Sequence, residues 1–98
     1  MINLEEIKQI AEDLKPLLRD QFGVTEMWVF GSFVRREEAL NSDLDLLVEI
    51  DNPNMSLLDF IDLEMSLSER FGIPVDLVEK DALKPGIGEH ILREARPV

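Results

Sequence analysis

The stretch from Phe30 to Glu49 reads FGSFVRREEALNSDLDLLVE, and its spacing decides the fold. Ten residues separate the Gly31-Ser32 pair from Asp43, and Asp45 follows two positions later. This spacing fits a strand, a small turn that exposes backbone, a short helix and a second strand. Such a turn can hold phosphate, and two neighbouring carboxylates can hold a divalent metal. The stretch therefore predicts a site for phosphate and metal.

Composition limits the classes of protein to which the chain can belong. Its 98 residues fit a single domain over 1–98, and its apolar fraction of 45% is typical of globular proteins. The net charge of −11 disfavours stable binding of nucleic acid and suits a basic partner or a cation site. The chain has no cysteine. We expect a cytoplasmic protein that does not enter a membrane, because no apolar run approaches the roughly 18 residues of a span and the start lacks a signal pattern.

Helical and strand patterns alternate along the chain, and they predict the order α-β-α-β-α-β-α. The fold class is therefore α/β (α+β), with about four helices flanking a small mixed three-stranded sheet. The predicted elements are a first helix that ends at Gly23, strands over Glu26–Phe30, Asp43–Ile50 and Pro74–Glu79, and helices over about Phe33–Glu38, Asn54–Arg70 and Ile87–Ala95. A turn is expected at Asn41-Ser42.

The first helix has a recognisable start and an internal proline. Asn3 and Glu6 have the spacing of a capping box. Pro16 lies inside the apolar pattern, so we expect a kink or break near Lys15.

The second predicted strand carries its carboxylates on one face. Side chains two apart on a strand point to the same side, so Asp43, Asp45, Leu47 and Glu49 share one face and the apolar residues between them share the core face. Two aspartates in a strand need a reason, because Asp is a poor strand former and close carboxylates repel. Mg²⁺ ions, in a pair about 3.5–4 Å apart, would remove the repulsion and assist phosphoryl transfer.

Asp76 repeats this pattern on the third predicted strand. If the second and third strands are neighbours, Asp76 completes a triad with Asp43 and Asp45. It would then be a metal ligand or the base that takes a proton from an attacking hydroxyl. The alternative is that all three aspartates form a solvated strand edge that discourages aggregation.

Gly31-Ser32 is either an ordinary turn with a helix cap or a phosphate-binding turn. The paired aspartates favour the second interpretation. The turn belongs to neither a P-loop nor a dinucleotide-binding motif, because GxxxxGK and GxGxxG are both absent. Arg35 lies three residues after Ser32 and could reach a triphosphate or steady an aspartate, or it could pair with Glu37 or Glu38 on the surface.

The residues GSFVRREEALNSDLDLLVE resemble the GS-x(10)-D-x-D signature of the polymerase-beta-like nucleotidyltransferases, and the chain most closely resembles their minimal (MNT) branch. The strands WVF and PVDLVE and the closing ILREARPV fit the same scheme. The resemblance implies the nucleotidyltransferase fold and transfer of AMP from ATP to a hydroxyl with Mg²⁺. It implies that Asp43, Asp45 and Asp76 hold the metals and catalyse the transfer, and that Gly31 and Ser32 bind phosphate.

The resemblance also implies a partner, because many stand-alone members are antitoxins that add AMP to a tyrosine of a HEPN toxin. Two alternatives stay open: an antitoxin that neutralises its partner by binding alone, and a nucleotidyltransferase acting on a small molecule. The chain departs from the branch at Val34, where a small residue is usual, and at Arg36, which stands where glycine is usual.

The predicted third helix has a wide apolar arc. Leu57, Leu58, Ile61 and Met65 recur on one side, and Phe60, Leu63 and Leu67 widen the arc. The arc either packs against a neighbouring helix or forms a surface for a partner or a second copy. We expect Trp28 in the core and His90 on the surface.

Overall fold

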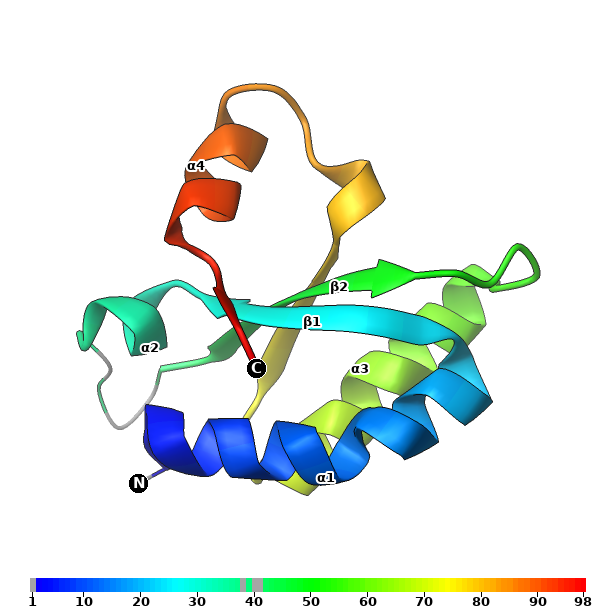
Figure 1. Ribbon diagram of the computed structural model, residues 1–98, viewed down its shortest axis with the longest axis horizontal. Coiled ribbons are helices and arrows are strands. Elements are labelled where there is room, and N and C mark those ends of the chain that lie inside the picture. Colours follow the sequence, from blue (N-terminus) through cyan, green and yellow to red (C-terminus); the bar gives the residue numbers. More distant parts are fainter. Residues whose placement is uncertain (1, 38, 40–41) are drawn as a thin grey trace.

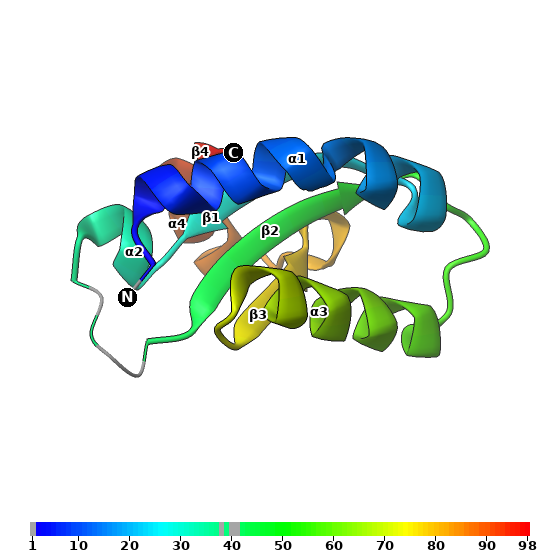
Figure 2. The same ribbon diagram turned by 90° about the horizontal axis from the view of Figure 1, so that it is seen from below.

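Two long helices cover one face of a four-stranded sheet, and a short helix stands on the opposite side (Figures 1 and 2). The computed structural model describes residues 2–37, 39 and 42–98. The elements are α1 (Leu4–Phe22), β1 (Val24–Phe30), α2 (Ser32–Arg35), β2 (Leu44–Ile50), α3 (Leu57–Phe71), β3 (Val75–Glu79), a 3₁₀ turn η1 (Lys80–Ala82), α4 (Ile87–Glu94) and β4 (Arg96–Pro97). None of the described helices is both long enough and apolar enough to cross a membrane.

The strands lie in the order β3-β2-β1-β4. β1 pairs antiparallel with β2 and with β4, whereas β2 and β3 are parallel. The mixed sheet is thus as predicted, but the prediction of three strands is wrong by one. The fourth strand has only two residues, Arg96 and Pro97, which pair with Val29 and Trp28 at the edge of the sheet. Two residues that include a proline carry no strand pattern, so β4 could not be predicted from the sequence.

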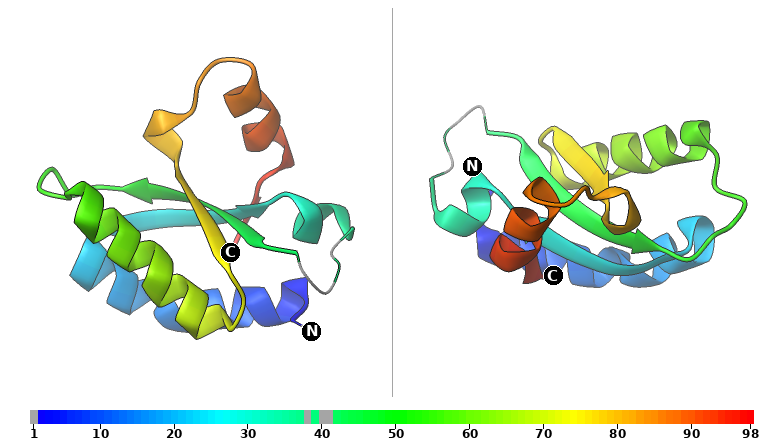
Figure 3. Two further views of the ribbon diagram at one scale, coloured as in Figure 1. Left: turned by 180° about the vertical axis from the view of Figure 1, so that it is seen from behind. Right: turned by 90° about the horizontal axis from the view of Figure 1, so that it is seen from above.

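The core lies between the sheet and the two long helices. α1 and α3 lie side by side below the sheet, whereas α4 lies above it (Figure 3). The buried core residues on the helices are Ile7, Ala11, Leu14, Leu18, Leu63, Leu67 and Phe71, and those on the strands are Val24, Met27, Val29, Leu44, Leu46, Val48, Val75 and Leu77, with Phe33 of α2 beside them.

Both long helices begin with a side-chain cap. The Asn3 side chain accepts a hydrogen bond from the Glu6 backbone N–H at 2.9 Å. Ser56 and Asp59 form a reciprocal capping box, so α3 starts at Leu57 rather than near Asn54 as predicted. Of the kink or break predicted near Lys15, the break is wrong, because α1 continues through Pro16 to Phe22. The proline ring is exposed, while Leu14 and Leu18 on either side of it are buried against the sheet.

α2 is shorter than predicted and ends at Arg35, because Arg36 adopts a left-handed conformation with φ 58° and ψ 38°. Arg36 is the one non-glycine residue with positive φ in the described part of the chain. Its position explains why glycine is usual there, since the turn out of α2 needs a backbone conformation that a Cβ disfavours. Glu38, to which the helix was predicted to extend, and Asn41 of the predicted turn lie outside the described residues.

Replacing Arg36 by glycine should stabilise the protein by about 0.5–1 kcal/mol, because glycine removes the left-handed penalty but adds chain entropy to the unfolded state. Thermal or urea unfolding measures this change. Arg36→Ala is the matched control, since it removes the same charge but keeps Cβ and should give no such gain. Equal stability of the two variants would show that the charge, not the backbone, matters.

Candidate active site

Three aspartates meet where β2 and β3 begin. Asp45 and Asp76 are direct partners in the parallel register, and Asp43 lies one residue before β2. Leu44, Leu46, Val75 and Leu77 are buried on the opposite side. The side chains of Asp45 and Asp76 therefore share the face of the sheet that α1 and α3 leave uncovered, and adjacent strands bring them together.

Gly31 lies directly against Asp45. Phe30, the last residue of β1, pairs with Asp45 across the antiparallel register. A Cβ at position 31 would meet the Asp45 carboxylate oxygen Oδ2 in a severe clash, and Gly31 has φ +80°. Both the space and the backbone therefore require glycine. This close approach places the backbone of the Gly31-Ser32 turn beside the carboxylates, and Ser32 is the first residue of α2.

Partial burial and the surrounding negative charges raise the pKa of Asp45 from 3.8 to about 6. Desolvation is the largest cause, followed by the negative charges of Asp76, Asp43 and Glu94, while the positive charge of Arg35 opposes them. A divalent cation would reverse this balance, and carboxylate oxygens are the ligands that Mg²⁺ prefers. The donor set thus fits such an ion. No three acidic or histidine side chains in the described residues already have the arrangement of a metal site.

Arg35 contacts two carboxylates. Its Nε donates to Glu37 Oε2 at 2.9 Å, and its Nη1 donates to Glu94 Oε1 at 2.6 Å. Hydrogen bonds to Glu37 and Glu94 raise the pKa of the guanidinium. The predicted surface pair with Glu37 therefore forms, and the same arginine also lies within electrostatic reach of Asp45.

Glu94 at the end of α4 is a site residue that sequence reasoning missed. Its Oε2 also accepts a hydrogen bond from the Gly31 backbone N–H at 3.0 Å. The segment ILREARPV matched the family scheme, but no local signal pointed to Glu94, which is 63 residues from Gly31. Only the pairing of β4 with β1 brings the two together.

The same face carries a second cluster farther along the sheet. Leu47, predicted to share the polar face with Asp43, Asp45 and Glu49, is fully buried between its sheet partners Trp28 and Val78. Trp28 is half-buried. It was predicted to lie in the core, but it is not part of the main core. Lys80 covers it, with Nζ 5.1 Å from the ring centroid and 3.4 Å from Glu49 Oε2. His90 is exposed, as predicted.

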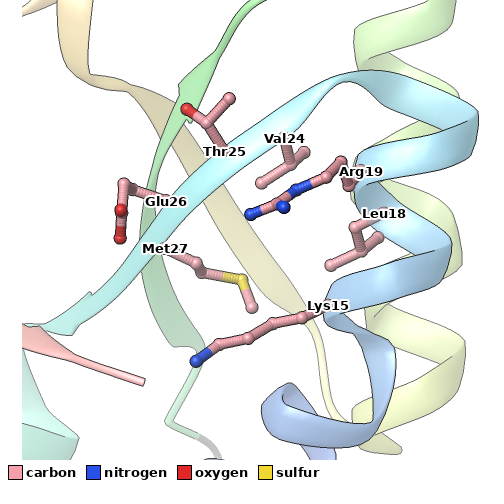
Figure 4. A pocket seen from close by; sticks show the side chains of 7 residues that line it. All are labelled: Lys15, Leu18, Arg19, Val24, Thr25, Glu26 and Met27. Carbon is pink, nitrogen blue, oxygen red and sulfur yellow. The ribbon is translucent and has the colours of Figure 1, made fainter.

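A pocket at the other end of β1 does not belong to this site. It lies between α1 and the start of β1, and Lys15 and Arg19 extend over the strand there (Figure 4). β4 covers the outer edge of β1 only at Trp28 and Val29. The two basic side chains therefore lie beside the part of the edge that β4 leaves unpaired, and charged residues in such places discourage pairing with other chains.

α3 exposes part of its apolar arc. Leu57, Leu58, Ile61 and Met65 are 74%, 76%, 41% and 60% exposed, and we call these four residues the α3 stripe. The rest of the arc packs inward, with Leu63 and Leu67 buried and Phe60 partly so. The arc is therefore wider than the chain's own core requires, and no neighbouring helix among the described residues covers the stripe.

Comparisons with known proteins identify the family and the fold. The family "Polymerase beta, Nucleotidyltransferase" matches residues 12–98. The protein adenylyltransferase MntA of Thermococcus cleftensis is 49% identical over 96% of this chain and 94% of its own. A solved structure assigned to the minimal nucleotidyltransferases is 36% identical, covers 99% of this chain and 97% of its own, and has a TM-score of 0.82.

Two more distant structures share the fold. A toxin–antitoxin structure with AMP-PNP has a TM-score of 0.74 at 20% identity and covers 89% of this chain and 70% of its own. The structure of a tri-AMPylated Shewanella oneidensis HEPN toxin in complex with MNT antitoxin has a TM-score of 0.67 at 18% identity. The match covers 92% of this chain and 69% of the other. At these identities the likeness concerns the fold alone.

The raised pKa of Asp45 predicts that Asp45→Asn increases the stability of the fold, by an amount that depends on pH. Because the folded-state pKa of about 6 exceeds the usual 3.8, the folded state holds this proton more tightly than the unfolded chain does. Ionised Asp45 therefore destabilises the fold above about pH 6, and the cost disappears as the pH falls towards 4. In EDTA, Asp45→Asn should raise the melting temperature by roughly a few degrees at neutral pH and by much less near pH 4.

Calorimetry at the two pH values measures this gain. Asp81→Asn on the exposed η1 turn is the matched control and should show no such dependence. An equal effect of Asp45→Asn at both pH values would contradict the assigned environment.

Proposed function

This chain belongs to the polymerase beta nucleotidyltransferase family, and from that premise we propose that it transfers AMP from ATP to a hydroxyl of a partner protein. The observation that carries the proposal is the junction of Gly31, Asp45 and Asp76, because a turn of the kind that can bind phosphate lies against one of two paired carboxylates. The Thermococcus cleftensis relative is named a protein adenylyltransferase, which supports AMP as the transferred group.

Each site residue receives a role. Asp43, Asp45 and Asp76 hold Mg²⁺, which would neutralise charge on the phosphates and on the attacking and leaving oxygens. The Gly31 N–H and the Ser32 hydroxyl donate to phosphate oxygens, and Arg35 adds a positive charge beside them. These are proposals that rest on residue chemistry and on the convergence of the three aspartates around Asp45.

The transfer itself is an in-line substitution. The acceptor oxygen attacks the α-phosphorus of ATP, the bond between this phosphorus and the bridging oxygen breaks, and pyrophosphate leaves. The acceptor proton passes to Asp76, which is exposed on the neighbouring strand. A second protein that closes the site would keep water from competing with the acceptor.

We propose that the partner is a HEPN-type toxin with tyrosine as the acceptor, and that it contacts the α3 stripe in addition to the opposite sheet face that carries the aspartates. The HEPN toxin and MNT antitoxin structure, which shares this fold, supports a HEPN toxin as the partner. Asp62 and Glu69 lie one helical turn beyond Leu58 and Met65, so carboxylates border the stripe. This border and the net charge of −11 favour a basic partner over a second copy of the chain.

The binding surface can be tested with the double change Leu58→Ser and Met65→Ser. It should weaken binding of the purified toxin by about tenfold or more, because exposed apolar anchors carry much of the affinity of an interface. The monomer's stability should change little, since both side chains are exposed. Leu92→Ser, at a 46% exposed position on α4, is the matched control. Wild-type affinity of the double variant in calorimetry would place the partner elsewhere.

The catalytic assignment predicts that Asp43→Asn and Asp45→Asn each lower transfer of radiolabelled AMP from ATP to the toxin by about 100-fold or more, because the metal-held charge compensation is lost. Asp81→Asn should keep full activity. The variants also separate the alternatives: if both still protect cells while transferring no AMP, the chain neutralises its partner by binding alone. Labelling of a small alcohol without the toxin would support a small-molecule acceptor.

A further inference from the structure

The Glu94 carboxylate accepts hydrogen bonds from two donors that could otherwise bind a phosphate. Its carboxylate accepts one hydrogen bond from the Gly31 N–H at 3.0 Å and another from Arg35 Nη1 at 2.6 Å. Its side chain is only 13% exposed, so the carboxylate is largely enclosed between α4 and the turn.

A backbone N–H and a guanidinium aimed at one anion form a typical oxyanion-binding pair. Here a carboxylate of the same chain satisfies both donors. The hydrogen bonds from Arg35 and Gly31 lower the pKa of Glu94 despite its burial, so the group is a full anion at neutral pH. It also adds to the negative field at Asp45.

We propose that Glu94 is an internal substitute for phosphate, and that nucleotide binding displaces its carboxylate from Gly31 and Arg35. This inference rests on the proposed function, since it concerns the phosphate-binding part of that site. In the free protein Glu94 is a positioning residue, because it keeps Arg35 turned towards Gly31. It is also a selectivity device: an incoming anion must replace an existing charge-assisted pair and enter a field of carboxylates. Polyphosphate that carries Mg²⁺ brings positive charge that offsets the repulsion from these carboxylates, whereas free phosphate does not.

Two other roles for Glu94 predict different results. If Glu94 were a further metal ligand, removing its charge would weaken the binding of Mg²⁺ and of Mg²⁺-bound nucleotide. If it were only a tie between α4 and α2, removing the charge would lower stability and leave affinity unchanged or reduced. Displacement by phosphate predicts the opposite sign, because removing the competing charge should tighten the binding of the incoming anion.

The test compares the wild-type protein with Glu94→Gln by calorimetric titration, using inorganic tripolyphosphate in EDTA and, separately, Mg²⁺ alone. We expect Glu94→Gln to bind tripolyphosphate about tenfold more tightly and to bind Mg²⁺ alone with unchanged affinity. Glu89→Gln is the matched control, since it removes the same charge from an exposed position on the same helix and should bind within about twofold of wild type. Equal or weaker tripolyphosphate binding by Glu94→Gln overturns the inference, as does an absence of binding by both proteins.

A second variant keeps the test decisive if Glu94→Gln folds poorly. Glu94→Asp retains the charge but is one methylene shorter, so it should loosen the contact with Gly31 and Arg35 and give an intermediate affinity. The amide resonance of Gly31 provides an independent readout: tripolyphosphate should shift it at lower concentration in either variant than in wild type. Unchanged titration midpoints would contradict displacement.

The result is separable from that of the proposed function. A wild-type protein that binds AMP-PNP but transfers no AMP would overturn the activity and leave the displacement of Glu94 intact. Normal transfer of AMP, together with equal tripolyphosphate affinities of wild type and Glu94→Gln, would support the proposed activity and overturn the displacement of Glu94.

Discussion

The parallel pairing of β2 with β3 is the constraint on which the site depends. Asp45 opposes Asp76 only in this register, and a shift by one residue would point one of them into the core. The register is fixed on the other face, where Leu44, Leu46 and Leu77 are buried under α1 and α3. Burial of apolar side chains on one face of the sheet thus determines where the carboxylates meet on the other.

This arrangement concentrates like charges at a partly dehydrated position. The ionised form of Asp45 is disfavoured, since its pKa rises to about 6 while Arg35 offsets only part of the repulsion. A fold selected for stability alone would not place three aspartates there. The conflict between local electrostatics and packing is what is expected at a functional site, where a bound cation resolves it.

The sequence indicated the parts of the site that depend on local spacing. Alternation along DLDLLVE assigned the carboxylates to one face, and the Gly31-Ser32 pair located the turn. Alternation specifies a face but not its burial, so Leu47 was misjudged: its cover comes from Trp28 and Val78 on other strands. Glu94 could not be predicted from local spacing either, because its contacts span 59 and 63 residues.

The C-terminal segment links the sheet edge to the site through very few contacts. β1 carries the Gly31 turn at its end and pairs with β4 at Trp28 and Val29, so the strand that positions the turn also positions Glu94 just before β4. β4 adds only two residue pairs, and Val98 after it donates one backbone hydrogen bond to Met27 and is partly buried against the core. Local opening is easiest where few apolar contacts hold a segment. The Glu94 carboxylate can therefore leave the turn while β2, β3 and their aspartates keep their register, because the interactions that hold the carboxylates in place are on the opposite face of the sheet.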